Sequence, residues 1–182
     1  MLAIVGLVQG VFVVQMGQVL TGLPGVNYLF YILISTWISL SFLMFEGKRF
    51  RAFLTVSIFI VLTIPTYVMG RPYDIFPRIP GVLTILVADI VFNSFYKSYK
   101  KRDHLLRWCT ILSVSFILLD VAFRTLLYPL FYSPEFIATF LNITLLLMPV
   151  ILIESFAGAY LGIKIHDRVK NMQSFKEESS ES

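Results

Sequence analysis

Long apolar runs separated by short polar clusters constrain this chain more than any other feature. An α-helix needs about 20 apolar residues to cross the roughly 30 Å hydrocarbon core of a bilayer. Six segments reach or approach that length, namely 2–20, 28–45, 53–69, 79–96, 106–128 and 136–163. Only 14% of the residues are charged, against about 25% in soluble domains. The sequence therefore predicts an all-α membrane protein built as a bundle of six transmembrane helices.

These segments define one transmembrane domain over residues 1–170, followed by a polar tail over 171–182. The tail is polar and rich in Ser and Glu, a composition typical of disordered segments. We interpret the first segment as a helix and not as a cleaved signal peptide, because no basic residue precedes Lys48. Pro149 falls near the middle of the last segment and predicts a kinked or strongly tilted helix.

The positions of the basic residues predict the orientation of the bundle. With six spans, 12 of the 15 Lys and Arg residues fall on one side, in the second loop, the fourth loop and the tail. Arg71 and Arg78 lie on the opposite side, and Arg124 lies within a span. Because Lys and Arg are enriched on the cytoplasmic side of membranes, we expect a multi-pass protein of the plasma membrane with both termini in the cytoplasm.

A group of polar residues in the outer half of the bundle forms a candidate binding site. Ionisable residues inside a membrane are costly, so each is a functional hypothesis. Asp120 and Arg124 are four residues apart on one helix face, where they can form an ion pair that is purely structural or that helps to bind a ligand. The predicted substrate-binding residues are Asn27, Arg78, Asp120, Arg124, Tyr128 and Asn142.

The last span adds a predicted polar stripe to this region. Glu135, Thr139 and Asn142 recur at helical spacing, and we expect them to face the interior of the bundle. Together with the nearby tyrosines they predict a polar pocket that opens outward. The alternative is the belt of Tyr and Trp that many membrane proteins carry at the level of the lipid headgroups.

Two further acids lie in the cytoplasmic half of the bundle. Asp89 precedes Asn93 by four residues, and Glu154 shares a helix face with Gly158 and Gly162. These acids could form a proton or cation relay, or they could hold helices together.

Small residues form two stripes at helical spacing. Gly6, Gly10 and Gly17 mark the first span, and Gly158 and Gly162 mark the last. Such stripes let helix backbones approach closely in membranes. The partner could be a helix of this chain or another protein.

Several function classes lack their usual residues. The only cysteine is Cys109, and the two histidines, His104 and His166, stand at the ends of apolar segments, so neither a metal site nor a haem site is expected. We find no motif of an intramembrane protease, a metallopeptidase, a lipid head-group transferase or a phosphate-binding loop. The basic residues are clustered between spans, which is not the pattern of a nucleic-acid-binding face. We therefore expect a non-enzymatic protein without a cofactor.

The whole-chain pattern resembles the substrate-binding S components of energy-coupling factor (ECF) transporters. The features that carry the resemblance are the Gly6/Gly10 stripe, the Gly-rich exit of the sixth helix into a basic tail, 154–170, and the Pro/Gly-rich external loop, 21–25. The resemblance implies a membrane transport subunit that binds a vitamin-like molecule or related micronutrient. It also implies partners, namely a transmembrane coupling protein and ATPases that power uptake.

Two other readings remain open from the sequence. One is a non-transporting scaffold or assembly protein, similar in architecture to the MreD family, which would use the glycine stripes and basic loops as contact surfaces. The other is a small proton- or cation-coupled carrier that would use Asp89 and Glu154. A polar cavity beneath the external loops would favour the substrate binder, and an outer half filled with Phe and Leu would favour the scaffold.

Overall fold

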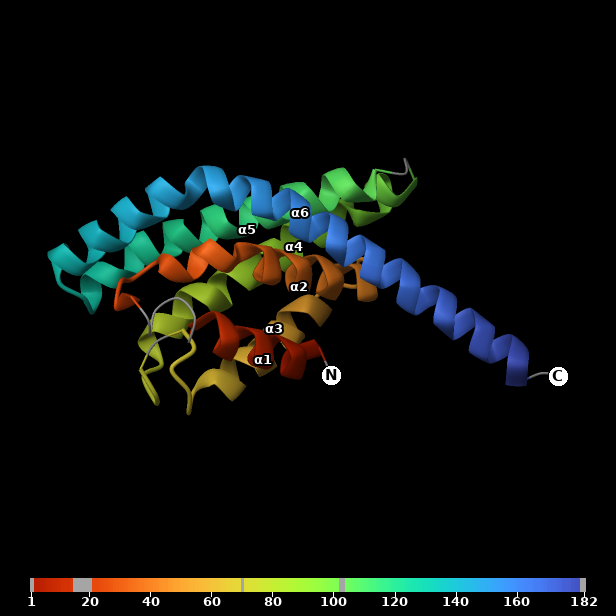
Figure 1. The fold of residues 1–182 in the computed structure, drawn as a ribbon, viewed down its shortest axis with the longest axis horizontal. Helices are drawn as coiled ribbons and strands as arrows, with labels where there is room; N and C mark the ends of the chain where they lie inside the picture. Colours follow the sequence, from red (N-terminus) through yellow and green to blue (C-terminus); the bar gives the residue numbers. More distant parts are fainter. Residues whose placement is uncertain (1, 15–20, 70, 102–103, 181–182) are drawn as a thin grey trace.

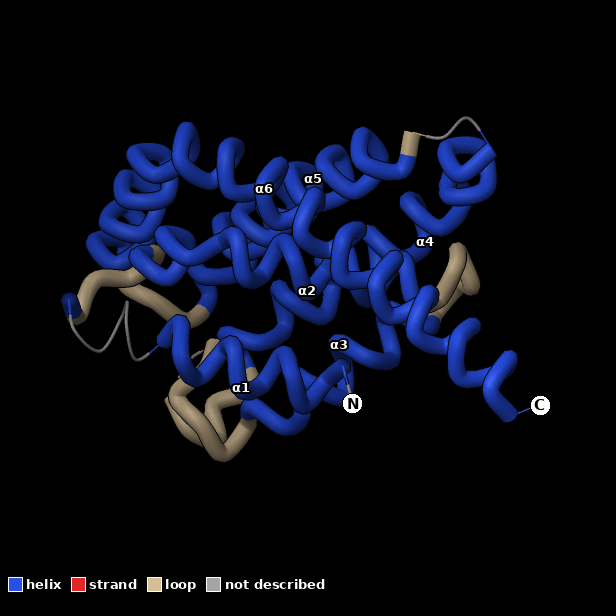
Figure 2. The backbone as a smooth tube through the Cα atoms, turned by 45° about the vertical axis from the view of Figure 1, so that its right-hand side comes forward, coloured by secondary structure: helices blue, strands red, loops and turns tan. Residues whose placement is uncertain are grey.

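The computed structural model describes residues 2–14, 21–69, 71–101 and 104–180, and these form helices joined by short loops. No strand occurs among the described residues, which confirms the all-α prediction. The elements in chain order are α1 (Leu2–Val14), η2 (Val26–Phe30), α2 (Tyr31–Met44), α3 (Arg51–Thr63), η3 (Phe76–Arg78), α4 (Ile79–Lys101), α5 (Leu105–Leu127), η4 (Tyr128–Leu130) and α6 (Pro134–Ser180). Figure 2 shows the loops gathered at the two ends of the helices.

Successive helices alternate in direction along the long axis of the molecule (Figure 1). Four helical stretches are long and apolar enough to cross a bilayer, and they are Val26–Met44, Phe76–Lys101, Leu105–Leu130 and Pro134–Met172. Two further apolar helices, Leu2–Phe12 and Arg51–Thr63, are shorter. The structure thus has the character of a membrane protein with four candidate spanning helices.

Two boundaries differ from the sequence-based expectation. The third segment, predicted over 53–69, is helical only to Thr63, because Pro65 has no backbone N–H that could donate to the carbonyl four residues before it and so cannot continue the helix. At the other end of the chain α6 continues to Ser180 through the tail expected to be disordered. That tail lacks Gly and Pro, the two residues that disfavour a helix most, so it can extend an existing helix. Figure 1 also shows that α6 is bent, and a proline inside the helix, Pro149, is a usual cause of such a bend.

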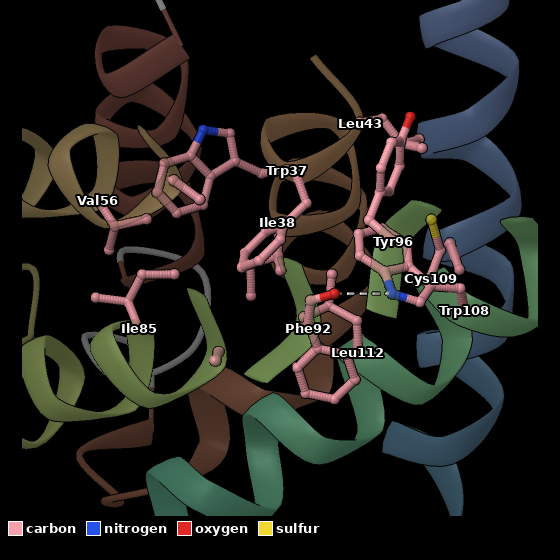
Figure 3. Packing of buried hydrophobic residues seen from close by; sticks show 14 of the residues in the cluster. Trp37, Ile38, Leu43, Val56, Ile85, Phe92, Tyr96, Trp108, Cys109 and Leu112 are labelled. Atoms are coloured by element: carbon pink, nitrogen blue, oxygen red, sulfur yellow. Dashed lines mark hydrogen bonds between the residues drawn. The ribbon is translucent and has the colours of Figure 1, made fainter. Parts of the chain in front are cut away.

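Aromatic packing fills the half of the bundle that contains the C-terminus of α4. Trp108 is 1% exposed and meets Phe42, Phe92 and Tyr96 edge-on, with ring centroids 6.0, 6.5 and 5.2 Å away. Its indole Nε1 donates to the Phe92 carbonyl at 3.3 Å, as Figure 3 shows. This end of the bundle therefore has a closed core.

The glycine stripe of α6 packs against α2. A Cβ atom on Gly158 would lie 2.6 Å from Ser35, and one on Gly162 would lie 2.8 Å from Ser39. Ser35 Oγ also donates to Ser113 Oγ on α5 at 2.9 Å. The small residues thus bring three helices of this chain together.

The glycine stripe of α1 also has partners inside the chain. A Cβ on Gly6 would lie 2.6 Å from the Trp37 ring, and one on Gly10 would lie 3.1 Å from Val68. Gly17, the third predicted member, lies outside the described residues. The close approach allows Trp37 Nε1 to donate to the Leu2 carbonyl at 2.8 Å. In the described part of α1, the glycines therefore serve internal packing.

Asp89 and Glu154 each accept hydrogen bonds from the N-terminal turn of another helix. The Asp89 carboxylate accepts from the amides of Phe50 and Phe53, at 2.8 and 2.7 Å, at the start of α3. Glu154 Oε2 accepts from the amide of Ile32, at 3.3 Å, at the start of α2. The first amides of a helix have no partners within the helix and carry partial positive charge. These bonds give both acids a structural role.

Candidate functional site

A cavity of about 810 Å³ lies among the helices at the end opposite the Trp108 core. Its walls come from α1, α2, α3, α5, the start of α6, and the loop between α3 and α4. Its volume is within the range of about 300–1,000 Å³ that is usual for small-molecule sites. The fold thus leaves room for a ligand in the half where the sequence places the candidate residues.

Asp120 and Arg124 form the polar centre of the cavity wall. Arg124 Nε donates to Asp120 Oδ2 at 2.7 Å, and the two side chains are only 13% and 7% exposed. The Tyr28 hydroxyl donates to the same Oδ2 at 2.6 Å, and Arg124 Nη1 donates to the Tyr128 hydroxyl. All four residues line the cavity. Two tyrosines therefore fix the geometry of the ion pair from either side.

The arrangement leaves hydrogen-bonding capacity on Arg124. A guanidinium carries five N–H donors in a planar fork, and the hydrogen bonds of Arg124 to described residues use Nε and Nη1. Its Nη2 makes no hydrogen bond to any described residue. A carboxylate or phosphate oxygen is the natural acceptor for such a donor.

Aromatic side chains make up much of the remaining wall. The lining includes Trp37, Phe59, Phe116, Phe136 and Phe140. Trp37 and Phe59 form a tilted pair with centroids 5.0 Å apart. Such walls favour ligands that carry an apolar or aromatic ring.

The loop between α3 and α4 and the loop between α5 and α6 meet at the edge of the cavity. Phe76 from η3 and Phe131 from the η4–α6 loop stack with centroids 4.3 Å apart and an interplanar angle of 24°. Tyr132 lies beside them, and burial raises the pKa of its hydroxyl, with Tyr128 and Asp74 raising it further. The Tyr132 hydroxyl therefore stays protonated at neutral pH and can donate a hydrogen bond.

Four of the six predicted binding residues line the cavity together, and they are Asn27, Asp120, Arg124 and Tyr128. Arg78 does not belong to the lining; it is 1% exposed and bonds to the backbone behind the wall. Asn142 also lies outside the lining and is exposed on α6.

The predicted polar stripe of the last helix is wrong in its direction. Glu135 and Asn142 are exposed, whereas Phe140 and Thr144 are buried and Phe136 and Phe140 line the cavity. Successive residues are about 100° apart around a helix. The predicted polar stripe is offset by one residue from the positions that face the cavity, so it points away from the interior of the bundle. In a membrane bundle the interior face can be aromatic, which hydropathy alone does not reveal.

Sequence reasoning missed Tyr28 and Tyr31 as parts of the site. Tyr31 lines the cavity and its hydroxyl donates to the Ser113 carbonyl at 2.7 Å. The available signal was a pair of tyrosines, at positions 28 and 31, at the very start of an apolar span, but that position is also typical of the interfacial belt.

No protein-family model, curated protein or solved structure matches the chain. Among the described residues, no three His, Cys, Asp or Glu side chains are grouped in a way that could hold a metal ion. The function is therefore inferred from the chemistry of the cavity and from the sequence.

Proposed function

We propose that the protein is a membrane transport subunit that binds a small, vitamin-like molecule in the outer half of a six-span bundle. In this proposal both termini are cytoplasmic, and a transmembrane coupling protein with ATPases drives uptake. The observation that carries the proposal is the 810 Å³ cavity with the Asp120–Arg124 pair in its wall.

The alternating helix directions support six crossings. α2 and α4 run the same way in Figure 1, so the chain returns through α3 and the loop that follows it. The 13 residues of α3 span only about 20 Å at 1.5 Å per residue. The 64–75 loop completes the crossing, and protein on its inner side supplies the hydrogen bonds that lipid cannot.

The wall chemistry supports an anionic ligand that carries a ring. Arg124 offers free N–H donors, and Asp120 and Tyr128 hold its guanidinium in place. The aromatic residues around the pair can pack on a ring. The ligand would thus gain orientation from the ion pair and affinity from apolar burial.

The cavity distinguishes this proposal from the alternatives. A scaffold protein has no need of a cavity of this size, and a filled outer half would suit it better. A cation-coupled carrier would place Asp89 and Glu154 along a water-filled path, whereas both accept bonds from helix N-termini. The substrate binder is therefore the function that the geometry supports best.

Native mass spectrometry of protein extracted gently from its own membrane tests the proposal. We expect the wild type to release a small molecule on activation, and Arg124→Lys to retain at least about tenfold less of it, because Lys lacks the planar fork. Arg107→Lys is the matched control, since it makes the same change on the same helix at the exposed opposite end. A wild-type protein that carries only lipids, or equal retention in Arg124→Lys, would count against the binding site.

A further inference from the structure

Arg78 is almost fully buried yet holds no ligand-facing position. Its side chain makes six hydrogen bonds, all to the chain between the end of α3 and the start of η3. The acceptors are the carbonyl oxygens of Thr63, Thr66, Val68, Arg71 and Asp74, and the hydroxyl of Thr63. The distances include 2.7 Å from Nη2 to the Thr63 carbonyl and 3.1 Å from Nη2 to that of Val68.

The hydrogen bonds of Arg78 go to backbone carbonyls and one hydroxyl, and not to carboxylates. No carboxylate of the described residues forms an ion pair with the Arg78 guanidinium. Five fixed N–H donors match acceptors spread over 12 residues of sequence, from 63 to 74. Only a planar, multidentate cation can tie so many carbonyls to one point, since an ammonium has three donors around a single atom.

The segment that Arg78 ties down forms one wall of the cavity. Tyr67, Val68, Met69, Arg71 and Asp74 all come from this segment and all line the cavity. The segment also contains left-handed backbone at Met69 (φ 64°) and Tyr73 (φ 63°). Side chains rarely adopt that conformation without support from the surrounding structure, and the bonds to Arg78 supply such support.

We propose that Arg78 is a positioning residue that holds residues 64–69 and 71–77, the described part of the 64–77 segment, as a preformed wall of the binding cavity. It acts from behind the wall, through the backbone, without touching the ligand. This inference rests on the proposed function only for its effect on binding; the ordering of the segment is a separate, measurable consequence.

Hydrogen–deuterium exchange of the full-length protein in detergent tests the ordering. We expect amides of 64–77 to exchange at least about tenfold faster in both Arg78→Gln and Arg78→Lys, because several hydrogen bonds are lost together. Arg71→Gln is the matched control. It removes a cation from the same segment but keeps the Arg71 carbonyl that Arg78 uses. Exchange in the control should stay within about twofold of the wild type.

A second readout reports on the cavity itself. Trp37 lines the cavity, whereas Trp108 is 1% exposed and does not belong to the lining. We expect quenching of Trp37 fluorescence by acrylamide to increase about twofold in the Arg78 variants as the wall loosens. Trp37→Phe, made in the wild type and in each Arg78 variant, identifies the part of the fluorescence that comes from Trp37. Should Arg78→Gln fail to fold, Thr63→Val gives a milder version of the same change. It removes the hydroxyl that accepts from Arg78 Nε and that donates to the Ile60 carbonyl, and it leaves the five carbonyl acceptors of Arg78 in place.

Each outcome decides the proposal. Wild-type exchange of 64–77 in Arg78→Lys would overturn it, because a point charge would then suffice. Faster exchange with unchanged Trp37 quenching and unchanged retention of the co-purified small molecule would also overturn it, since the segment would not shape the cavity. A wild-type protein that retains no small molecule would contradict the proposed function alone, and exchange and quenching would still decide the role of Arg78.

Discussion

At the scale of single residues, the buried charges show what the sequence can and cannot reveal. Hydropathy alone marks Asp89, Asp120, Arg124 and Glu154 as exceptional, and the i,i+4 spacing correctly pairs Asp120 with Arg124. The other partners come from distant parts of the chain, such as Tyr28, which lies 92 residues from Asp120. Arg78 looks like a ligand-binding cation in the sequence, because nothing there indicates that backbone carbonyls surround it.

The bond from Tyr28 to Asp120 yields the first prediction. Tyr28→Phe removes one donor to a buried carboxylate and should lower the free energy of unfolding by about 2 kcal/mol. The measurement is thermal unfolding followed with a thiol-reactive dye, because the single cysteine, Cys109, is buried and reacts only once the core opens. Tyr160→Phe, at an exposed position of α6, is the control and should change stability by less than about 0.5 kcal/mol. Equal melting of the two variants would show that the bond contributes nothing.

The cap that Asp89 provides yields the second prediction. Asp89→Asn keeps the shape of the side chain but replaces a charged acceptor of three hydrogen bonds with a neutral amide. We expect a loss of about 2 kcal/mol in the same unfolding assay. Asp167→Asn makes the same change on an exposed side chain and should be nearly neutral. Wild-type stability of Asp89→Asn together with lost uptake would instead support the ion-relay reading.

At the scale of elements, the sequence predicted well the helices that are continuous over a long apolar segment. It did not predict the end of α3, where a loop takes over within the apolar segment. The helix cores of α4 and α5 follow the predicted segments 79–96 and 106–128 closely. α3 ends at Thr63, six residues before its predicted end, because Ile64-Pro65 and the Arg78 bonds turn the next stretch into a loop. Hydropathy could not detect this end, since the loop includes apolar residues that line the cavity.

The contact between α2 and α6 yields a prediction about small residues. In Gly158→Ala the new Cβ would lie 2.6 Å from Ser35 and 2.7 Å from the Ile32 carbonyl, so the helices must separate. We expect a loss of about 1–3 kcal/mol in the unfolding assay, as for other overpacked contacts. Gly10→Ala is a graded control, because its nearest atom is a Val68 side-chain methyl at 3.1 Å. A melting temperature of Gly158→Ala at or above that of Gly10→Ala would contradict close packing at α6.

At the scale of the whole molecule, the position of the cavity follows from how the two ends of the bundle are filled. Trp108 and its aromatic neighbours close one end. At the other end α3 is short, and the loop that follows it replaces helix in the wall. The sequence predicted a polar site in this half from Asp120 and Arg124, but its size depends on aromatic residues that resemble ordinary core or lipid-facing positions.

Topology yields the last prediction, because the six crossings that we propose would place the α3–α4 loop and the α2–α3 loop on opposite sides of the membrane. Tyr73 is 76% exposed and Lys48 is exposed, so cysteines at these positions are open to reagents, while Cys109 is buried. A membrane-impermeant maleimide applied to intact cells should label Tyr73→Cys and leave Lys48→Cys unlabelled until the cells are permeabilised. Ser133→Cys, in the exposed loop before α6, should label like Tyr73→Cys, since α4 and α5 form a complete hairpin between them. The reverse pattern would invert the orientation that the basic residues predict. Labelling of Lys48→Cys and Tyr73→Cys from the same side would show that α3 and the loop after it do not cross the membrane. The cavity wall that they form would then face the side on which the α2–α3 and α3–α4 loops both lie.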